Sequence, residues 1–178
     1  HILYDFIDHF IICESKYDHQ GKKKKINFNK NKYPKFKNKI THVILEKFPK
    51  GLNPWERQAL QREEILKGLK KSKDNDLILF SDPDEIPNPK KLKSIKIKKK
   101  YLIFLQDLFY YKLNLKDYKL KNKWEGRRGC LKKNLKSIDF MRQKVVKKNL
   151  KYSFWRVDKE KNIQVIKNGG WHFSYLLT

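Results

Sequence analysis

The run YLIFLQDLFYYKLNL, residues 101–115, constrains the fold of this chain more than any other feature. Its aromatic and β-favouring residues predict a long strand, bent near Asp107. Three shorter runs, at residues 6–15, 40–48 and 77–80, also predict strands, and the first of them is typical of a buried one. The chain is therefore expected to form a sheet.

A helix is expected between the second and third of the short strands. The segment NPWERQALQREEILKGLKK offers Asn53 as its N-cap and Pro54 in its first turn. Its apolar residues near one face are Trp55, Ala59, Leu66 and Leu69. A short helix could also start at Asn88 and Pro89. Because strands and helices alternate, we predict an α/β fold with a mixed sheet flanked by helices.

The pattern is weaker from Lys116 onward. A turn is expected over Gly126 to Gly129, and residues 139–150 are compatible with a helix or a loop. Residues 163–177 predict two short strands joined by a hairpin-type turn at Asn168 to Gly170. No internal repeat or second domain is evident, so we expect one domain over residues 1–178.

The formal charge of +25 is almost all lysine, which favours anionic partners such as nucleic acid. Richness in Lys, Asn and Ile with a single alanine, Ala59, is also what an AT-rich coding sequence produces. We therefore interpret the lysines chiefly as a general positive surface charge, not as part of a specific site. A basic nucleic-acid-binding module remains an alternative function, although no RNA- or DNA-binding motif supports it.

Cys13 and Cys130 are the only cysteines, which excludes a disulfide framework and a CxxC zinc site but leaves one bridge between them open. No stretch approaches the ~18 apolar residues of a membrane span, and no signal peptide is recognisable. The first residue is His1 rather than Met, so we expect the chain to be a piece of a longer product.

The stretch ILFSDPDEIPNP, residues 78–89, places Asp82, Asp84 and Glu85 directly behind a predicted strand. Ligands of open α/β sheets gather at such strand ends, and two aspartates one residue apart can hold a hard divalent cation that also binds substrate phosphates. Prolines within the stretch would fix its backbone. Two alternatives are an acidic turn that caps the following helix and a phosphatase-type Asp-x-Asp strand end, which the following Ile-Pro matches poorly.

Five segments in this order resemble the family 17 glycosyltransferases, the β-1,4-mannosyl-glycoprotein N-acetylglucosaminyltransferases. They are CES at 13–15, the W-x-x-x-x-x-Q-R segment at 55–62, SDPDEIP at 81–87, the aromatic strand at 108–111 and GGWHFSY at 169–175. The conjunction is far more specific than any one motif and spans nearly the whole chain. The family's first strand, with its Asp-Cys-Phe-Pro-Phe-like segment, is expected to be missing.

The resemblance implies a GT-A-like domain and an inverting transfer of N-acetylglucosamine, or a related sugar, from a UDP-sugar to a mannose-containing glycan or glycoprotein. It also implies dependence on Mn²⁺ or Mg²⁺, with Asp82, Asp84 and His172 as metal ligands; a core histidine bonded within the hairpin is the alternative for the last. The residues expected to contact the donor are Glu14, Ser15, Gln61, Arg62 and Asp82.

Inversion needs a base that takes the proton of the acceptor hydroxyl. Glu125 and Asp107 are the candidates, and Glu85 is less suitable because it lies so near the metal. Residues that could stack on sugar faces are Trp124, Tyr110, Tyr111 and Trp171, although aromatics are more often core residues. A degenerate transferase that binds glycan without turnover is a further alternative. Eukaryotic relatives imply a Golgi-type membrane, and a microbial or viral source implies the cytoplasm.

Overall fold

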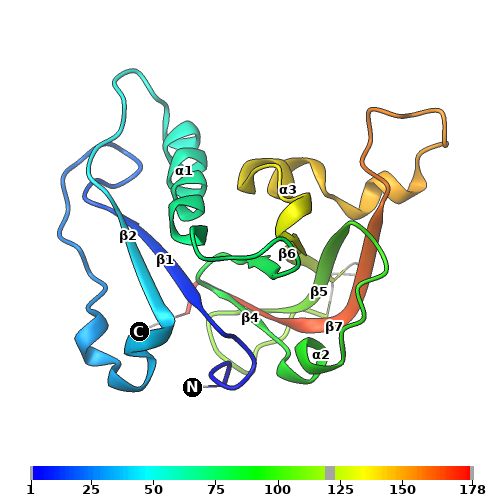
Figure 1. Ribbon diagram of the computed structural model, residues 1–178, viewed down its shortest axis with the longest axis horizontal. Coiled ribbons are helices and arrows are strands. Elements are labelled where there is room, and N and C mark those ends of the chain that lie inside the picture. The colour runs from blue at the N-terminus through cyan, green and yellow to red at the C-terminus, as the bar shows by residue number, and fades with distance from the viewer. Residues whose placement is uncertain (1, 119–122, 177–178) are drawn as a thin grey trace. The chain divides into compact units, whose positions relative to one another are not determined.

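The computed structural model describes residues 2–118 and 123–176 (Figure 1). Its contacts divide the chain into two compact units. Unit 1 is His1–Ser72 with Ser137–Asp139, and unit 2 is Lys73–Lys136 with Phe140–Thr178. We describe each unit by itself.

Unit 1 contains two parallel strands, an α-helix and short 3-10 helices, two of which span Lys30–Lys32 and Pro34–Lys39. The strands are β1, Phe10–Ser15, and β2, Ile40–Leu45, and the helix is α1, Pro54–Glu63, which continues as a 3-10 helix over Glu64–Leu69. The predicted start of α1 is confirmed. Asn53 accepts hydrogen bonds from the amides of Trp55 and Glu56, and the Glu56 carboxylate accepts one from the Asn53 amide, so the helix begins with a complete capping box.

Both strands of unit 1 are shorter and less buried than expected. The chain before β1 forms a turn in which the amides of Phe6 and Ile7 donate to the carbonyl of Leu3, and Ser15 is the one buried residue of β1. A two-stranded sheet has no central strand, which leaves both strands partly exposed. Trp55, one of the four apolar residues expected near one face of the helix, is exposed.

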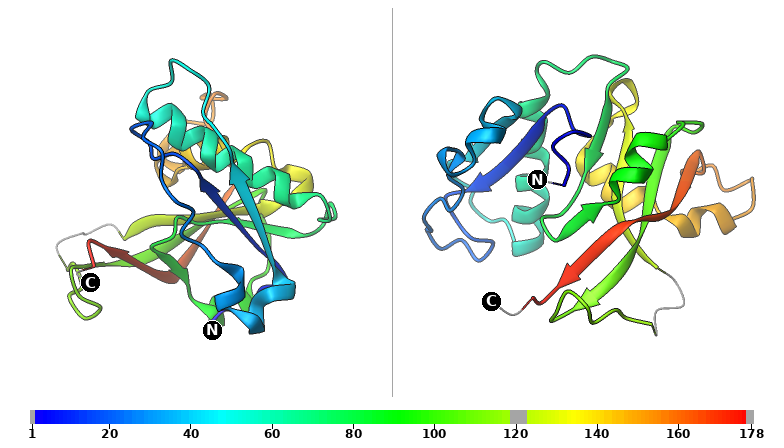
Figure 2. Two further views of the ribbon diagram at one scale, coloured as in Figure 1. Left: turned by 90° about the vertical axis from the view of Figure 1, so that its left-hand side faces the viewer. Right: turned by 90° about the horizontal axis from the view of Figure 1, so that it is seen from below.

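Unit 2 is built on a five-stranded mixed sheet with the order β3-β6-β5-β7-β4 (Figures 1 and 2). The β5–β7 pair is parallel and the other pairs are antiparallel. The strands are β3, Leu77–Phe80; β4, Glu85–Pro87; β5, Tyr101–Tyr110; β6, Trp124–Leu131; and β7, Ile163–Ser174. The sheet is curled, and the prediction of a mixed α/β fold is confirmed at this level.

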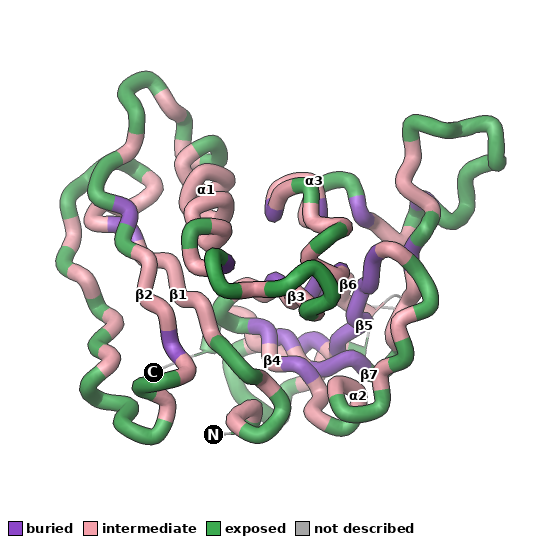
Figure 3. Tube along the Cα trace, in the orientation of Figure 1, coloured by how far each residue is buried: buried purple, intermediate pink, exposed green. Residues whose placement is uncertain are grey.

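The core of unit 2 surrounds the central strand β5, whose residues Tyr101–Phe104 are fully inaccessible to solvent (Figure 3). The helix α3, Ile138–Lys144, contributes to this core through Met141, whose sulfur lies 3.6 Å from Cys130 Sγ. The short helix α2, Pro89–Ser94, starts where it was predicted, with the Asn88 side chain accepting from the Lys90 amide. The 139–150 segment is helical in part, with a 3-10 helix over Lys147–Lys151 after α3.

The turn expected over Gly126 to Gly129 is wrong, because these residues lie inside β6, next to the central strand. Their glycines serve close packing instead. A Cβ on Gly126 would lie 1.8 Å from the Gln106 Oε1 atom, and one on Gly129 would lie 2.7 Å from a Leu79 methyl. Glycine in a strand often marks such an approach.

The hairpin expected near the C-terminus is also wrong. Residues 163–174 form one strand, β7, with a bulge: Phe104 pairs with Ile166, but Gln106 pairs with Gly170. Asn168 and Gly170 have positive φ values of 53° and 147°, and a Cβ on Gly170 would lie 2.1 Å from the Ile86 carbonyl oxygen. The Asn-Gly-Gly sequence therefore lets β4 approach β7. Leu177 lies outside the described residues.

The long strand β5 ends at Tyr110, five residues before its predicted end, because Tyr111 turns the chain with a φ of 61°. The register of β5 with β7 shifts between Phe104 and Gln106, and the bend expected near Asp107 stays a prediction. Both cysteines are free thiols, so the bridge left open above is not formed. Among the described residues, no helix has the length and apolar character needed to cross a membrane.

Candidate functional site

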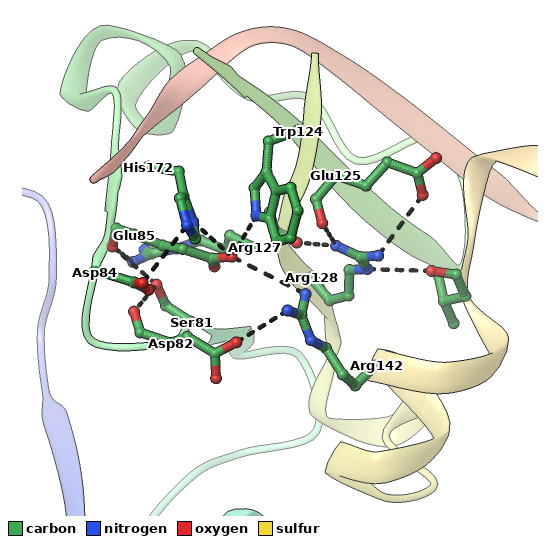
Figure 4. Close-up of polar contacts among 12 residues, drawn as sticks. Ser81, Asp82, Asp84, Glu85, Trp124, Glu125, Arg127, Arg128, Arg142 and His172 are labelled. Atoms are coloured by element: carbon green, nitrogen blue, oxygen red, sulfur yellow. Dashed lines mark hydrogen bonds and ion pairs between the residues drawn. The ribbon is translucent and has the colours of Figure 1, made fainter. Parts of the chain in front are cut away.

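The loop between β3 and β4 carries the acidic stretch and is a tight turn (Figure 4). The Ser81 hydroxyl donates to the carbonyl of Glu85 at 2.9 Å, and the Glu85 amide donates to the carbonyl of Asp82 at 3.1 Å. The Phe173 amide of β7 donates to the carbonyl of Asp84 at 2.9 Å. These bonds hold Asp82, Asp84 and Glu85 in three different surroundings.

Asp84 lies beside His172. Its Oδ2 is 3.5 Å from His172 Nε2, and the same nitrogen lies 2.7 Å from the Ser174 hydroxyl. The Asp84 side chain is 44% exposed, whereas the His172 side chain is buried. His172 pairs with Glu85 in the β4–β7 register. One carboxylate and one imidazole nitrogen therefore face each other at the edge of the sheet.

Glu85 is buried behind this pair (Figure 4). Its Oε1 accepts a hydrogen bond from the Trp124 indole at 3.1 Å, lies 3.7 Å from His172 Nδ1 and lies 4.0 Å from Arg142. Burial alone would raise the pKa of Glu85, but the His172 ring, the Trp124 N–H and the Arg142 charge together lower it. Glu85 is therefore held as a buried anion that supports the histidine.

Asp82 points to a different partner, the guanidinium of Arg142 on α3, at 3.0 Å. The carboxylates of Asp82 and Asp84 therefore have separate partners. Arg142 bridges Asp82 and Glu85, which places one cation against two of the three acidic residues of the loop.

Two further arginines lie in β6. Arg128 donates to three carbonyls, those of Val145 at 3.1 Å, Glu125 and Gly126. Arg127 donates to the carbonyl of Glu85 at 3.4 Å. Burial lowers the pKa of both guanidiniums to about 10. The neighbourhood of the acidic loop is therefore rich in buried positive charge.

The two candidate bases lie in different environments. The Glu125 carboxylate accepts from the Lys147 amide at 2.9 Å and lies 3.7 Å from Arg128. The Asp107 carboxylate lies between Lys116 at 3.1 Å and Lys123 at 3.2 Å. Burial raises the pKa of Asp107, but these two ammonium groups outweigh it and lower the pKa overall.

A cavity of about 180 Å³ lies beside Asp107, and Gln106 and Trp124 also line it. The Trp124 ring contacts His172, with centroids 4.7 Å apart. Tyr110 and Tyr111 each stack on Tyr175. The remaining aromatic candidate, Trp171, lies in β7 opposite Asp107. A role in sugar binding for these aromatics stays a prediction.

The donor candidates of unit 1 include Glu14, Ser15 and Gln61, which have partners within that unit. Glu14 accepts from Lys24 Nζ at 2.8 Å and from the amides of Asn27 and Phe28 at 2.7 and 3.0 Å. Ser15 is buried and accepts from the Tyr17 amide.

On α1, Gln61 lies 3.2 Å from a His19 ring nitrogen, and Arg62 is partly exposed beside it. Contact of these four residues with a donor stays a prediction.

Among the sequence candidates of unit 2, the structure brings Asp84 and His172 together and directs Asp82 to Arg142. The sequence analysis missed the arginines at 127, 128 and 142 and the supporting role of Glu85. The adjacent arginines in WEGRRGCL could have drawn attention to this strand. Two neighbouring arginines among glycines and apolar residues indicate buried guanidiniums, which need hydrogen-bond acceptors close by. Arg142 has no comparable signal within a lysine-rich background.

The donor set fits a divalent cation only as an open site. No three His, Cys, Asp or Glu side chains among residues 2–118 and 123–176 gather into a group that could hold a metal. Asp84 and His172 offer two donors on one side, and hard cations often complete their coordination with water and substrate phosphate oxygens. The carboxylate of Glu85 near His172 Nδ1 is the support that metal-binding histidines usually have.

Comparison with known proteins agrees with the sequence motifs. Searches of curated proteins and of solved structures found no match. The sequence model of one protein family, described as glycosyltransferase family 17, matches residues 1–178, which is the whole chain. The chain therefore belongs to glycosyltransferase family 17.

Proposed function

We propose that this glycosyltransferase is inverting and metal-dependent, and that it moves N-acetylglucosamine or a related sugar from a UDP-sugar to a mannose-containing glycan or glycoprotein. The observation that carries this proposal is the Asp84–His172 pair at the sheet edge, with Glu85 buried behind it. Family membership supports the transfer of a sugar, and the pair would bind the cation that holds the diphosphate end of the donor.

Asp84 and His172 Nε2 would hold Mn²⁺ or Mg²⁺, which would neutralise the charge that develops on the UDP diphosphate as the sugar–phosphate bond breaks. Glu85 would keep the His172 proton on Nδ1, which leaves Nε2 with its lone pair directed to the exposed side. The Ser174 hydroxyl, at 2.7 Å, would donate to Nε2 when no ligand is bound.

Asp82 would contribute to donor binding by positioning Arg142. The ion pair at 3.0 Å holds one oxygen of Asp82 against a positive charge, so Asp82 would be a weaker ligand of the cation than Asp84. Arginine matches the geometry of phosphate oxygens as well as that of a carboxylate. Arg142 would therefore exchange part of its contact with Asp82 for the diphosphate.

Inversion requires the acceptor hydroxyl to attack the anomeric carbon opposite the departing UDP while a carboxylate accepts its proton. Of the two candidates, we assign this role to Glu125. Two lysines lower the pKa of Asp107 and make it a weak base. Glu125 has one backbone amide donor and a more distant Arg128.

The test is product formation from radiolabelled UDP-N-acetylglucosamine and a mannose-containing glycan with Mn²⁺, together with the shift in melting temperature that UDP and Mn²⁺ produce. Asp84→Asn should abolish both signals because the amide loses the anionic oxygen. Asp74→Asn, a neutral replacement in the exposed turn before β3, is the matched control and should retain both.

Absence of both signals in the unmodified protein would contradict the proposal. A melting shift without product would assign the chain to glycan or nucleotide binding without turnover. Glu125→Gln should lose product and keep the shift, and the same result for Asp107→Asn instead would move the base to that residue.

A further inference from the structure

The segment between the 3-10 helix Lys147–Lys151 and β7 exposes large apolar side chains. We call residues 152–159 the aromatic loop. Within it, Phe154 is 73% exposed, Trp155 is 75% exposed and Val157 is 92% exposed. Single exposed apolar residues are common, but adjacent ones in one segment mark an interaction site.

The aromatic loop is held in a defined shape. The Arg156 amide donates to the Ser153 carbonyl at 3.0 Å, and the Lys161 ammonium donates to the same carbonyl. At its base, the buried Asn149 side chain donates to the carbonyls of Lys144 at 2.7 Å and Glu160 at 3.0 Å. The apolar side chains are therefore presented outward by a preformed turn, which lowers the entropy lost on binding.

The aromatic loop and the segments on either side of it are rich in basic residues. They are Lys147, Lys148, Lys151, Arg156, Lys159 and Lys161, against the two acidic residues Asp158 and Glu160. The acidic Asp158 is paired with Arg156 at 2.8 Å and with Lys159 at 3.0 Å, so its charge is compensated within the loop. An excess of positive charge remains beside Phe154 and Trp155.

The loop extends beyond the five-stranded sheet of unit 2 in Figure 1 and in the right-hand view of Figure 2, and most of its trace is exposed (Figure 3). A projecting apolar tip with a basic rim matches the interface of an anionic bilayer, where aromatic rings lie at headgroup depth and lysines contact the lipid charges. We propose that the aromatic loop binds the surface of an anionic membrane, with Phe154, Trp155 and Val157 entering the interfacial region.

Single-stranded nucleic acid would also meet aromatic and basic residues, but its bases need free ring faces on which to stack. The rings of Phe154 and Trp155 lie against each other, with centroids 4.0 Å apart. The ring of Tyr152 lies within 5.5 Å of Arg156 and 5.8 Å of Lys159. These contacts favour insertion of the loop as a unit into lipid.

The test is flotation of the full chain with phosphatidylcholine vesicles that contain or lack phosphatidylserine. We expect binding to the anionic vesicles that weakens with salt. Replacing both Phe154 and Trp155 by Ser should lower the partition coefficient by at least about tenfold, since each ring loses its burial in lipid. Trp55→Ser is the matched control, because Trp55 is 78% exposed in unit 1, and it should bind as the unmodified protein does.

A second measurement follows tryptophan emission. Anionic vesicles should shift the emission to shorter wavelength, and Trp155→Phe should remove most of the shift while retaining binding. No binding to anionic vesicles, or equal binding by the Phe154/Trp155 double variant, would overturn the proposal. The protein could instead bind an oligonucleotide and not the vesicles. If that binding depended on Phe154 and Trp155, the proposal would be overturned in favour of nucleic acid.

Discussion

Glu14 in unit 1 and Asp84 in unit 2 are acidic residues at strand ends, but their surroundings differ. Glu14 receives one lysine and two backbone amides, all from the loop that follows β1. Asp84 has the His172 ring at 3.5 Å, and its side chain is 44% exposed. A carboxylate whose lone pairs are filled by its own loop stabilises that loop, whereas one that faces solvent beside an imidazole can still accept a ligand.

The difference arises from the residues that follow each strand. Lysines and an open loop follow β1, so the backbone can wrap around Glu14. Asp84 lies between two prolines, Pro83 and Pro87, of which the first directly precedes it, and proline has no amide to donate. Substitutions in the two surroundings should therefore differ in their effects on stability.

Glu85→Ala should lower the free energy of unfolding by about 3 kcal/mol. The change removes the buried anion that lies between His172, Trp124 and Arg142 and leaves Arg142 with less compensation. Chemical denaturation measures the effect. Glu63→Ala, on α1, is the control and should lower the free energy of unfolding by a smaller amount. A loss under about 1 kcal/mol would show that Glu85 is not a structural support for the site.

Glu14 should make unit 1 sensitive to acid. Burial raises the pKa of Glu14, but Lys24 and two backbone amides outweigh it and lower the pKa to about 2, from an ordinary value of 4.5. A lowered pKa in the folded state stabilises the fold above pH 4.5, and this contribution falls as the pH drops from about 4.5 to about 2.

Because solvent screens the site, we expect a loss of about 1–2 kcal/mol over that range. Glu14→Gln should remove this part of the pH dependence of unfolding. An unchanged acid profile in the variant would mean that Glu14 is not held as an anion, and the contrast with Asp84 would fail.

The pair Asp82–Arg142 should show a coupling of about 1 kcal/mol in a double-mutant cycle of Asp82→Asn and Arg142→Met. The contact at 3.0 Å is partly buried, which limits screening by solvent. Asp84→Asn with Arg142→Met is the comparison cycle and should show less coupling. Equal coupling in the two cycles would mean that Arg142 does not distinguish the two aspartates.

Local chemistry in the sequence predicts much of the fold. The N-cap at Asn53, the start of α2 and the strands around LILF and YLIFL follow from residue preferences within a few positions. The glycines of β6 and β7 do not. In both strands a glycine is required by a side chain or carbonyl from a neighbouring strand, such as Gln106 or Ile86, and no local pattern carries that information.

The candidate site also has a part that the sequence predicts and a part that depends on the tertiary structure. The Asp-x-Asp motif and the late histidine are visible as residues, and the structure brings Asp84 and His172 together. The separation of Asp82 from Asp84 depends on Arg142, which comes from a helix sixty positions later in the chain. Which carboxylate is open is therefore a tertiary property.

The proposed function requires Asp84, together with His172, to be the open ligand of the cation. Calorimetric titration of Mn²⁺ in the presence of UDP measures whether it is. Asp84→Asn should weaken binding by more than about tenfold, and Asp82→Asn and Glu14→Gln should change it by less than about threefold. Binding that survives Asp84→Asn but is lost in Asp82→Asn would contradict the account.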